Sequence, residues 1–139
     1  DHRRAFSHFI LGRMIQASDA DLAQRHFQTA MRYLQNSSNT QLHRAQISAR
    51  MAAYEITRGN GSTALDLVRP SIATAAQFEN AALLSTLMLL QAEALLLTGD
   101  FDAARAVRLD SLGWARYGFG SDWAVRSKMN EIASLGPNS

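Results

Sequence analysis

Four histidines could bind a metal ion, because imidazole is the side chain that most often ligates metals in proteins. They are His2, His8, His26 and His43. No two of them stand three or four residues apart, the spacing that puts two ligands on one face of a helix, and no HExxH motif occurs. The chain also contains no cysteine, which excludes thiol catalysis, disulfides and iron–sulfur ligation. We therefore expect neither a metal site nor a cofactor.

Acid–base and nucleophilic catalysis have little support in the sequence. Asp100 and Asp102 are closely spaced carboxylates, but they stand at the predicted start of a helix, where acids stabilise the exposed N–H groups. No GxSxG motif places a serine on a strained turn, and the glycine pairs in 59–61 and 118–120 lack the Gly-Lys-Ser/Thr of a phosphate loop. The sequence thus predicts a non-catalytic domain.

Glu93 is the most distinctive carboxylate, because it stands among leucines in 81–97, the most apolar stretch of the chain. This stretch is shorter than the roughly 20 apolar residues of a membrane span and contains Ser85, Thr86 and Gln91, so we expect a core helix and no membrane span. A carboxylate in such surroundings needs a partner or a wet face, and we expect Glu93 to pair with an arginine of a neighbouring helix. An enzyme is the third functional hypothesis; it requires Glu93, a histidine and an arginine to meet in a deep pocket.

The composition describes one domain with a weak net charge. The 139 residues are 47% hydrophobic, and the formal charge is +2. Residues 1–58 carry eight arginines against four acidic residues, so the basic charge lies in the first half of the chain. A net charge of this size is too small to indicate a polyanion, and we do not expect nucleic acid as the main partner. The basic first half nevertheless motivates the alternative function, a regulatory module of a transcription-associated protein.

Helix breakers recur at a nearly constant distance along the chain. Gly59 and Gly99 are 40 residues apart, and Asn39, Asn80 and Ser121, all of types that cap helices, follow one another at intervals of 41. The segments between them are rich in alanine, leucine, arginine and glutamine, which favour helix. We therefore predict seven helices, at residues 2–17, 19–36, 40–58, 62–77, 81–98, 101–117 and 122–134.

Local signals refine these helices. Ser18 is predicted to cap the second helix, with Asp21 completing a capping box. Pro70 is predicted to kink or split the fourth helix, because its ring and missing N–H disturb a helix interior. The second helix is predicted to expose to water a set of polar side chains, namely Gln24, Arg25, Gln28, Arg32 and Gln35.

A period of about 40 residues, with one helix pair in each unit, indicates an all-α helical repeat array. A lone helix pair of this size cannot bury its apolar face, so neighbouring pairs stack and share a core. We expect a single domain over 1–139, a piece of a longer chain. It divides into the helix pairs 2–36, 40–77 and 81–117 and a terminal capping helix at 122–134.

The segment 96–105, Leu-Leu-Thr-Gly-Asp-Phe-Asp-Ala-Ala-Arg, resembles the turn between the two helices of a tetratricopeptide repeat. Ala92 matches the small residue of that family where the helices approach closely, and Ala52, Gly59 and Ala64 repeat the pattern one unit earlier. The interval of 41 residues is nearer the longer repeats of bacterial transcriptional activators of the maltose-regulator type. The resemblance implies a right-handed stack of antiparallel helix pairs, a tetratricopeptide-like α-solenoid of about seven helices.

The resemblance also implies where a partner binds. In this family the first helix of each pair faces the concave side of the array and contacts a bound peptide or helix. The matching candidate positions are His8, Gly12, Gln16, Gln46, Ala49, Ala53, Thr86, Leu89, Glu93, Ser127 and Asn130. Such a groove is small-sided and nearly neutral, and it lacks the lysine and arginine clamp that holds a terminal carboxylate.

Aromatic residues gather near the end of the chain. Trp114, Tyr117 and Trp123 are interleaved with arginine and glycine, a pattern that can stack bases or grip a peptide. Sealing the end of the array is the interpretation we favour, and an exposed tryptophan would mark a contact with a partner.

The sequence therefore predicts a protein–protein interaction or scaffold domain. Its partner is another polypeptide, another domain of its own chain, or a second copy in a homo-oligomer. The compartment is not assigned by any signal; a cytoplasmic location is slightly favoured and a periplasmic one is compatible with the sequence.

Overall fold

The computed structural model describes residues 2–35 and 37–119, which form six α-helices and no strand. The helices are α1 (His2–Ile15), α2 (Ala20–Leu34), α3 (Gln41–Thr57), α4 (Gly61–Gln77), α5 (Ala81–Leu97) and α6 (Phe101–Phe119). The first six predicted helices are confirmed, with ends within two residues of the prediction. The seventh, 122–134, lies outside the described residues. None of the six helices combines the length and apolar character needed to cross a bilayer.

Short polar side chains begin α2 and α5. The Asp19 carboxylate accepts a 3.0 Å hydrogen bond from the Leu22 N–H, and Asn80 caps α5 in the same way, as predicted. These bonds satisfy N–H groups that have no partner inside the helix. The prediction that Ser18 caps α2 is wrong, because its hydroxyl donates instead to the Ile15 carbonyl at the end of α1.

The turns after α3 and α5 have the same geometry. Gly59 and Gly99 have positive φ angles of 77° and 86°, and the residue after each glycine donates to a carbonyl five residues back, at 2.8 and 2.9 Å. This is a Schellman motif, which favours glycine because a Cβ would be strained there. The predicted cap Asn39 is wrong: it adopts a positive φ of 61° in the turn, and Thr40 is the N-cap residue of α3.

The same Schellman turn also ends α4, where Glu79 has a φ of 53° and the Asn80 N–H donates to the Ala75 carbonyl at 3.0 Å. The turn therefore follows each helix from α3 to α5, and only the glycine in it recurs at 40 residues.

Pro70 lies inside α4, which continues through it as one helix. Of the two predicted outcomes, a split of the helix is wrong, and a kink stays a prediction. Because proline has no N–H, it cannot donate to the Asp66 carbonyl one turn earlier. The Pro70 carbonyl itself accepts a 3.3 Å hydrogen bond from the Thr74 hydroxyl.

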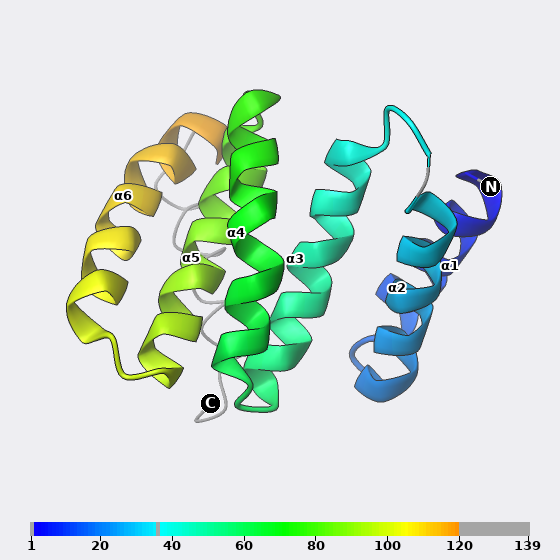
Figure 1. The fold of residues 1–139 in the computed structure, drawn as a ribbon, viewed down its shortest axis with the longest axis horizontal. Helices are drawn as coiled ribbons and strands as arrows, with labels where there is room; N and C mark the ends of the chain where they lie inside the picture. Colours follow the sequence, from blue (N-terminus) through cyan, green and yellow to red (C-terminus); the bar gives the residue numbers. More distant parts are fainter. Residues whose placement is uncertain (1, 36, 120–139) are drawn as a thin grey trace.

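Consecutive helices pack against each other and run in opposite directions (Figure 1). α1 packs on α2, α3 on α4 and α5 on α6; α4 also packs on α5, and α3 contacts α5. Successive helix pairs are joined by the contact of α2 with α3 and by the contact of α4 with α5. The contact of α2 with α3 is much the sparser. Helices α3 to α6 therefore form one continuous unit, to which α1 and α2 attach at one end.

The apolar core is divided at the same place. One cluster joins α1 and α2 to α3, with buried members Ala5, Phe9, Ala23, Phe27, Ala30, Leu34 and Ile47. The other fills the space between α3 and α6, and α5 supplies more of its buried residues than any other helix. The expectation of a core helix at 81–97 is thus confirmed. We call the boundary between the two clusters the α2–α3 junction.

Candidate functional site

The predicted groove residues at the middle of α1 face α2. Nδ1 of His8 lies 2.9 Å from Nδ1 of His26, so the two rings share a hydrogen bond. Gly12 is buried against Phe27, where an added Cβ would come within 2.6 Å of the ring. This side of α1 packs on its partner helix instead of facing an open groove.

The predicted groove residues of α3 and α5 are largely covered. Ala49 and Leu89 are only 8% and 5% exposed and belong to the core. Gln46, Ala53 and Thr86 are half-buried. Side chains of this kind offer a partner little surface, so a groove along α3 and α5 would be shallow.

Glu93 finds the partner that we expected. Its carboxylate accepts a 2.7 Å hydrogen bond from the guanidinium of Arg108 on α6, and the side chains are 19% and 45% exposed. The ion pair explains how a carboxylate is accommodated in the most apolar helix.

The aromatic residues near the end of the chain are described in part. Trp114 lies on α6 and is 46% exposed. The structure describes the backbone of Tyr117 but not its side chain. Three further predicted residues lie entirely outside the described part of the chain, namely Trp123, Ser127 and Asn130. Whether this group seals the array therefore stays a prediction.

Two pockets open at the α2–α3 junction, and neither was predicted from the sequence. The first, the Gln24 pocket, has a volume of about 120 Å³ and is lined by Gln16, Gln24, Arg50, Ala53 and Tyr54 among others. Two predicted groove residues, Gln16 and Ala53, meet here, and Gln16 accepts a 3.3 Å hydrogen bond from Arg50. The prediction that Gln24 faces water is wrong: it is 5% exposed, because it lies on the side of α2 that meets α3.

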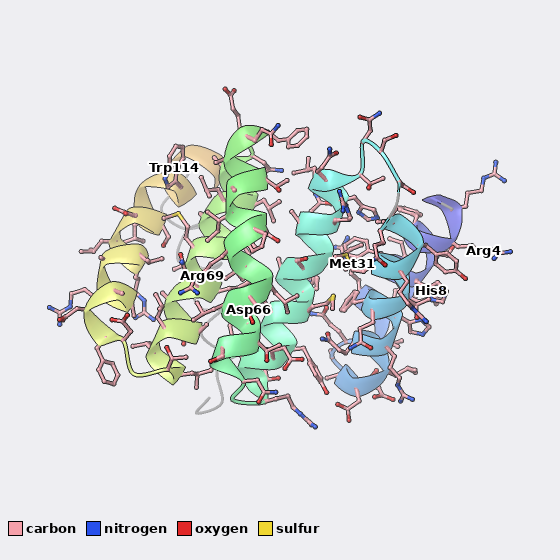
Figure 2. The ribbon with its side chains drawn as sticks, viewed as in Figure 1. Arg4, His8, Met31, Asp66, Arg69 and Trp114 are labelled. Atoms are coloured by element: carbon pink, nitrogen blue, oxygen red, sulfur yellow. The ribbon has the colours of Figure 1, made fainter. Side chains whose placement is uncertain are left out.

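The second pocket, the Arg44 pocket, has a volume of about 220 Å³. It lies where α2, α3 and α4 meet and is lined by Met31, Arg44, Ser48, Ser71 and Thr74 among others. Figure 2 shows Met31 in the space between α2 and α3. The pocket thus combines a cationic side chain with hydroxyl groups and an apolar wall.

Three buried polar atoms at this junction have no hydrogen-bond partner in the described structure. They are Oε1 of Gln24, Nε of Arg44 and Nε2 of His43. Gln24 and Arg44 line the two pockets, and His43 packs edge-on against Phe9, with ring centroids 5.1 Å apart. Nearly all buried polar atoms in native proteins are satisfied, so a concentration of unsatisfied ones marks the junction as the candidate site.

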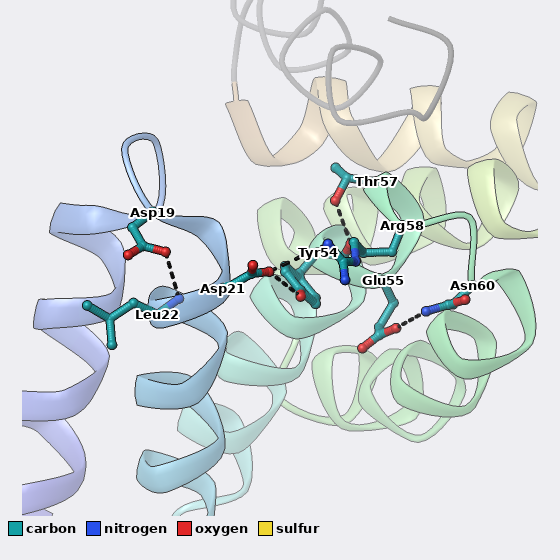
Figure 3. A network of polar contacts seen from close by, with 8 residues as sticks. All are labelled: Asp19, Asp21, Leu22, Tyr54, Glu55, Thr57, Arg58 and Asn60. Atoms are coloured by element: carbon teal, nitrogen blue, oxygen red, sulfur yellow. Dashed lines mark hydrogen bonds and ion pairs between the residues drawn. The ribbon is translucent and has the colours of Figure 1, made fainter.

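A polar network closes one end of the junction (Figure 3). The Tyr54 hydroxyl of α3 donates a 2.6 Å hydrogen bond to Asp21 of α2, and Arg58 lies 3.7 Å from the same carboxylate. The hydrogen bond to Asp21 raises the pKa of Tyr54 above its ordinary value, because the hydroxyl can donate this bond only while it is protonated. The network thus links the start of α2 directly to the end of α3.

The histidine pair does not complete a metal site. Among the described residues, no group of three or more His, Cys, Asp or Glu side chains converges. His8 instead stacks on Tyr33, over which the Arg4 guanidinium lies 5.9 Å from the ring centroid. The pair is therefore part of an aromatic and cationic cluster between α1 and α2.

One signal in the sequence could have located the junction. Gln24 stands three residues before Phe27, and Arg44 stands three residues before Ile47, so each occupies a position at helical spacing beside a buried apolar residue. A polar residue within such a stripe is informative, because it must find a partner or border a cavity.

No protein-family model, no curated protein and no solved structure matches the chain. The functional interpretation therefore depends on the fold and on the geometry of its surfaces.

Proposed function

We propose that this domain is a non-catalytic module that binds another polypeptide, built as a tetratricopeptide-like stack of antiparallel helix pairs. The observation that carries the proposal is the exposure of large apolar side chains on the first and last described helices, α1 and α6, which we call the end helices. On α1 these are Phe6, Leu11 and Met14, and on α6 they are Phe101, Leu109 and Trp114. Where such side chains lie together they form an apolar patch, which is typical of a protein contact site.

The stacked architecture is supported by two features of the backbone. Helices α3 to α6 pack in antiparallel succession (Figure 1), and α3 packs against α5 as equivalent helices of neighbouring units do. We extend this arrangement to α1 and α2 as a preceding unit, in which α1 packs mainly on α2 and much less on α3. The proposal of a right-handed α-solenoid rests on these features.

A binding role is favoured over the enzyme hypothesis by the positions of the titratable groups. That hypothesis requires Glu93 to meet a histidine and an arginine in a deep pocket. Glu93 instead forms an ion pair with Arg108, and neither junction pocket is lined by Glu93 or a histidine.

The test is a selection of peptides on the immobilised domain from a displayed random library, followed by affinity measurements on variants of the two end helices. Met14→Glu and Leu109→Glu replace side chains that are 74% and 63% exposed, so both variants should fold normally. Gln28→Glu, on the exposed face of α2, is the matched control.

We expect the selected peptides to lose at least tenfold in affinity for one end-helix variant and to bind the control as well as the wild type. A selection that enriches no peptide, or peptides that bind all three variants equally, would contradict the proposal.

The alternative, a nucleic-acid-associated regulatory module, is favoured by one observation. Exposed arginines lie on α1 and α2, including Arg13, Arg25 and Arg32. Binding of this kind weakens steeply with salt, because phosphate contacts release counterions. Fluorescence anisotropy of a DNA duplex, measured from about 50 to 200 mM salt, separates the two functions. The main proposal expects a flat signal even at the lowest salt, whereas saturable, salt-sensitive binding would favour the alternative.

A further inference from the structure

We infer that the Arg44 pocket is a binding site for a carboxylate, in which the Arg44 guanidinium recognises the negative charge. The inference is independent of the proposed function, since it concerns a different surface and holds whether the carboxylate belongs to a free small molecule or to an acidic side chain of a polypeptide.

The shape of the pocket sets the size of the ligand. Its volume is about 220 Å³, and it opens between α2, α3 and α4. A cavity of about 150 Å³ accommodates benzene, so this pocket has room for a carboxylate on a short apolar body. Met31, Ala45 and Pro70 supply the apolar wall that such a body would contact.

The charge of the pocket comes from one residue. Arg44 is the only ionisable side chain in the lining, and no carboxylate pairs with it among the residues that the structure describes. Its Nε is buried without an acceptor, although a guanidinium N–H is a strong donor. Because Nε is buried, a ligand in the pocket meets the guanidinium through its two Nη groups, and a carboxylate accepts from both of them in the two-point geometry that arginine favours.

The remaining polar groups favour a monoanion. The hydroxyls of Ser71 and Thr74 already donate to the carbonyls of Leu67 and Pro70, at 2.9 and 3.3 Å. The donors left for a ligand are therefore Arg44, the Ser48 hydroxyl and the side-chain amide of Gln41. One positive charge with two neutral donors matches a carboxylate, whereas a phosphate dianion is usually held by several cations or by a cluster of N–H groups.

The test uses sodium benzoate as the probe in a two-dimensional NMR titration of the ¹⁵N-labelled protein, with sodium chloride at equal ionic strength as the reference. We expect saturable shifts of the Arg44 Nε–H signal and of the backbone amides of Ser48, Ser71 and Thr74. Non-saturating shifts identical to those in sodium chloride would overturn the inference. This titration uses the wild-type protein only.

Variants assign the effect to the guanidinium. Arg44→Gln should weaken benzoate binding at least tenfold. Arg44→Lys keeps the positive charge but loses the two parallel N–H donors of the guanidinium, and it should weaken binding less. Arg69→Gln is the control, because Arg69 is exposed on α4 and does not line the pocket; Figure 2 shows it on the flank of α4 away from Met31. Equal affinity in Arg44→Gln and the wild type would overturn the assignment.

Further probes identify the source of the carboxylate. A short peptide with blocked ends and one glutamate, and the same peptide with glutamine, are titrated alongside benzoate. If the glutamate peptide binds more tightly than benzoate and the glutamine peptide does not bind, the carboxylate belongs to a polypeptide. If benzoate binds more tightly than the glutamate peptide, the carboxylate belongs to a free small molecule. Inorganic phosphate that binds more tightly than either would overturn the carboxylate class. Because the end-helix variants leave Arg44 intact, the proposed function and this inference can fail separately.

Discussion

Glu93 stands in the most apolar helix of the chain, yet its carboxylate is only partly withdrawn from water. The ion pair with Arg108 has a hydrogen bond of 2.7 Å, and Glu93 is much the less exposed partner. The pair is thus intermediate in burial. A fully exposed ion pair contributes little to the free energy of unfolding, and a buried one must offset a large desolvation cost.

A double-mutant cycle measures the contribution of this pair. We expect a coupling free energy of about 0.5 to 1 kcal/mol between Glu93→Gln and Arg108→Gln, at the upper end of the range for exposed pairs. Urea denaturation of the wild type, both single variants and the double variant gives the value. A coupling near zero would show that solvent screens the pair completely.

Tyr54 and Asp21 give a prediction in alkaline solution. Asp21 raises the pKa of Tyr54, so the hydroxyl stays protonated to a higher pH in the folded protein than in the unfolded chain. The stabilisation from this contact is complete below the unfolded pKa and is lost as the pH rises through the folded pKa. Asp21→Asn should move the Tyr54 transition toward its ordinary value.

The measurement is the absorbance of tyrosinate during an alkaline titration. The chain has three tyrosines, so the curve of Tyr54→Phe is subtracted to isolate the residue. An unchanged transition in Asp21→Asn would show that the carboxylate is not its cause.

At the scale of the helix, glycine has opposite roles in α1 and α6. Gly12 lets α1 approach α2 closely, since a Cβ there would lie 2.6 Å from the ring of Phe27, which is itself buried against Phe9. Gly113 lies inside α6 with open space around it. Alanine at Gly12 would add a steric clash, whereas alanine at Gly113 would add only its intrinsic preference for helix. Substitutions at the two positions therefore measure these two effects separately.

We expect Gly12→Ala to lower the free energy of unfolding by about 1 to 3 kcal/mol, the usual cost of overpacking a core. Gly113→Ala should raise it by about 0.5 to 1 kcal/mol, because alanine loses less entropy than glycine in a helix. Thermal and urea denaturation of both variants check the signs. Stabilisation by Gly12→Ala would mean that α1 and α2 can move apart at no cost.

For the whole molecule, the division of the core has a consequence for stability. The cluster of α1 and α2 has half as many buried members as the cluster of α3 to α6, and the contact between α2 and α3 is sparse. Regions with few buried contacts open at lower free energy than the rest of a protein. We therefore expect α1 and α2 to exchange their amide hydrogens through an opening that leaves α3 to α5 folded.

Two isoleucines of α3 provide a matched test. Ile47 and Ile56 are both fully buried, but Ile47 belongs to the first cluster and Ile56 to the second. Each Ile→Val substitution should cost about 0.5 to 1.5 kcal/mol. In native-state hydrogen exchange, Ile47→Val should accelerate the amides of α1 and α2 selectively, whereas Ile56→Val should act on α3 to α5. Equal effects on all helices would show that the domain opens as one cooperative unit.

Much of the secondary structure could be predicted from the sequence, because the signals that begin and end a helix are local. Asn80 caps α5, and the glycines at 59 and 99 end α3 and α5, through hydrogen bonds within a few residues. The errors were also local: Ser18 and Asp19 are both good caps, and adjacent residues compete for one position. The pairing of Glu93 with an arginine was predictable from the cost of leaving a carboxylate unpaired in an apolar helix.

The sequence by itself thus determined the six helices of the described residues, their limits to within two residues and the central place of the most apolar helix. Only the tertiary structure decided that His8 and Gly12 face α2, that Gln24 is buried and that Arg44 borders a pocket. The physical reason is that capping and helix propensity act between neighbours in the chain. Which face of a helix is covered depends instead on how well all the side chains of two helices fit together, and at the α2–α3 junction that fit is incomplete.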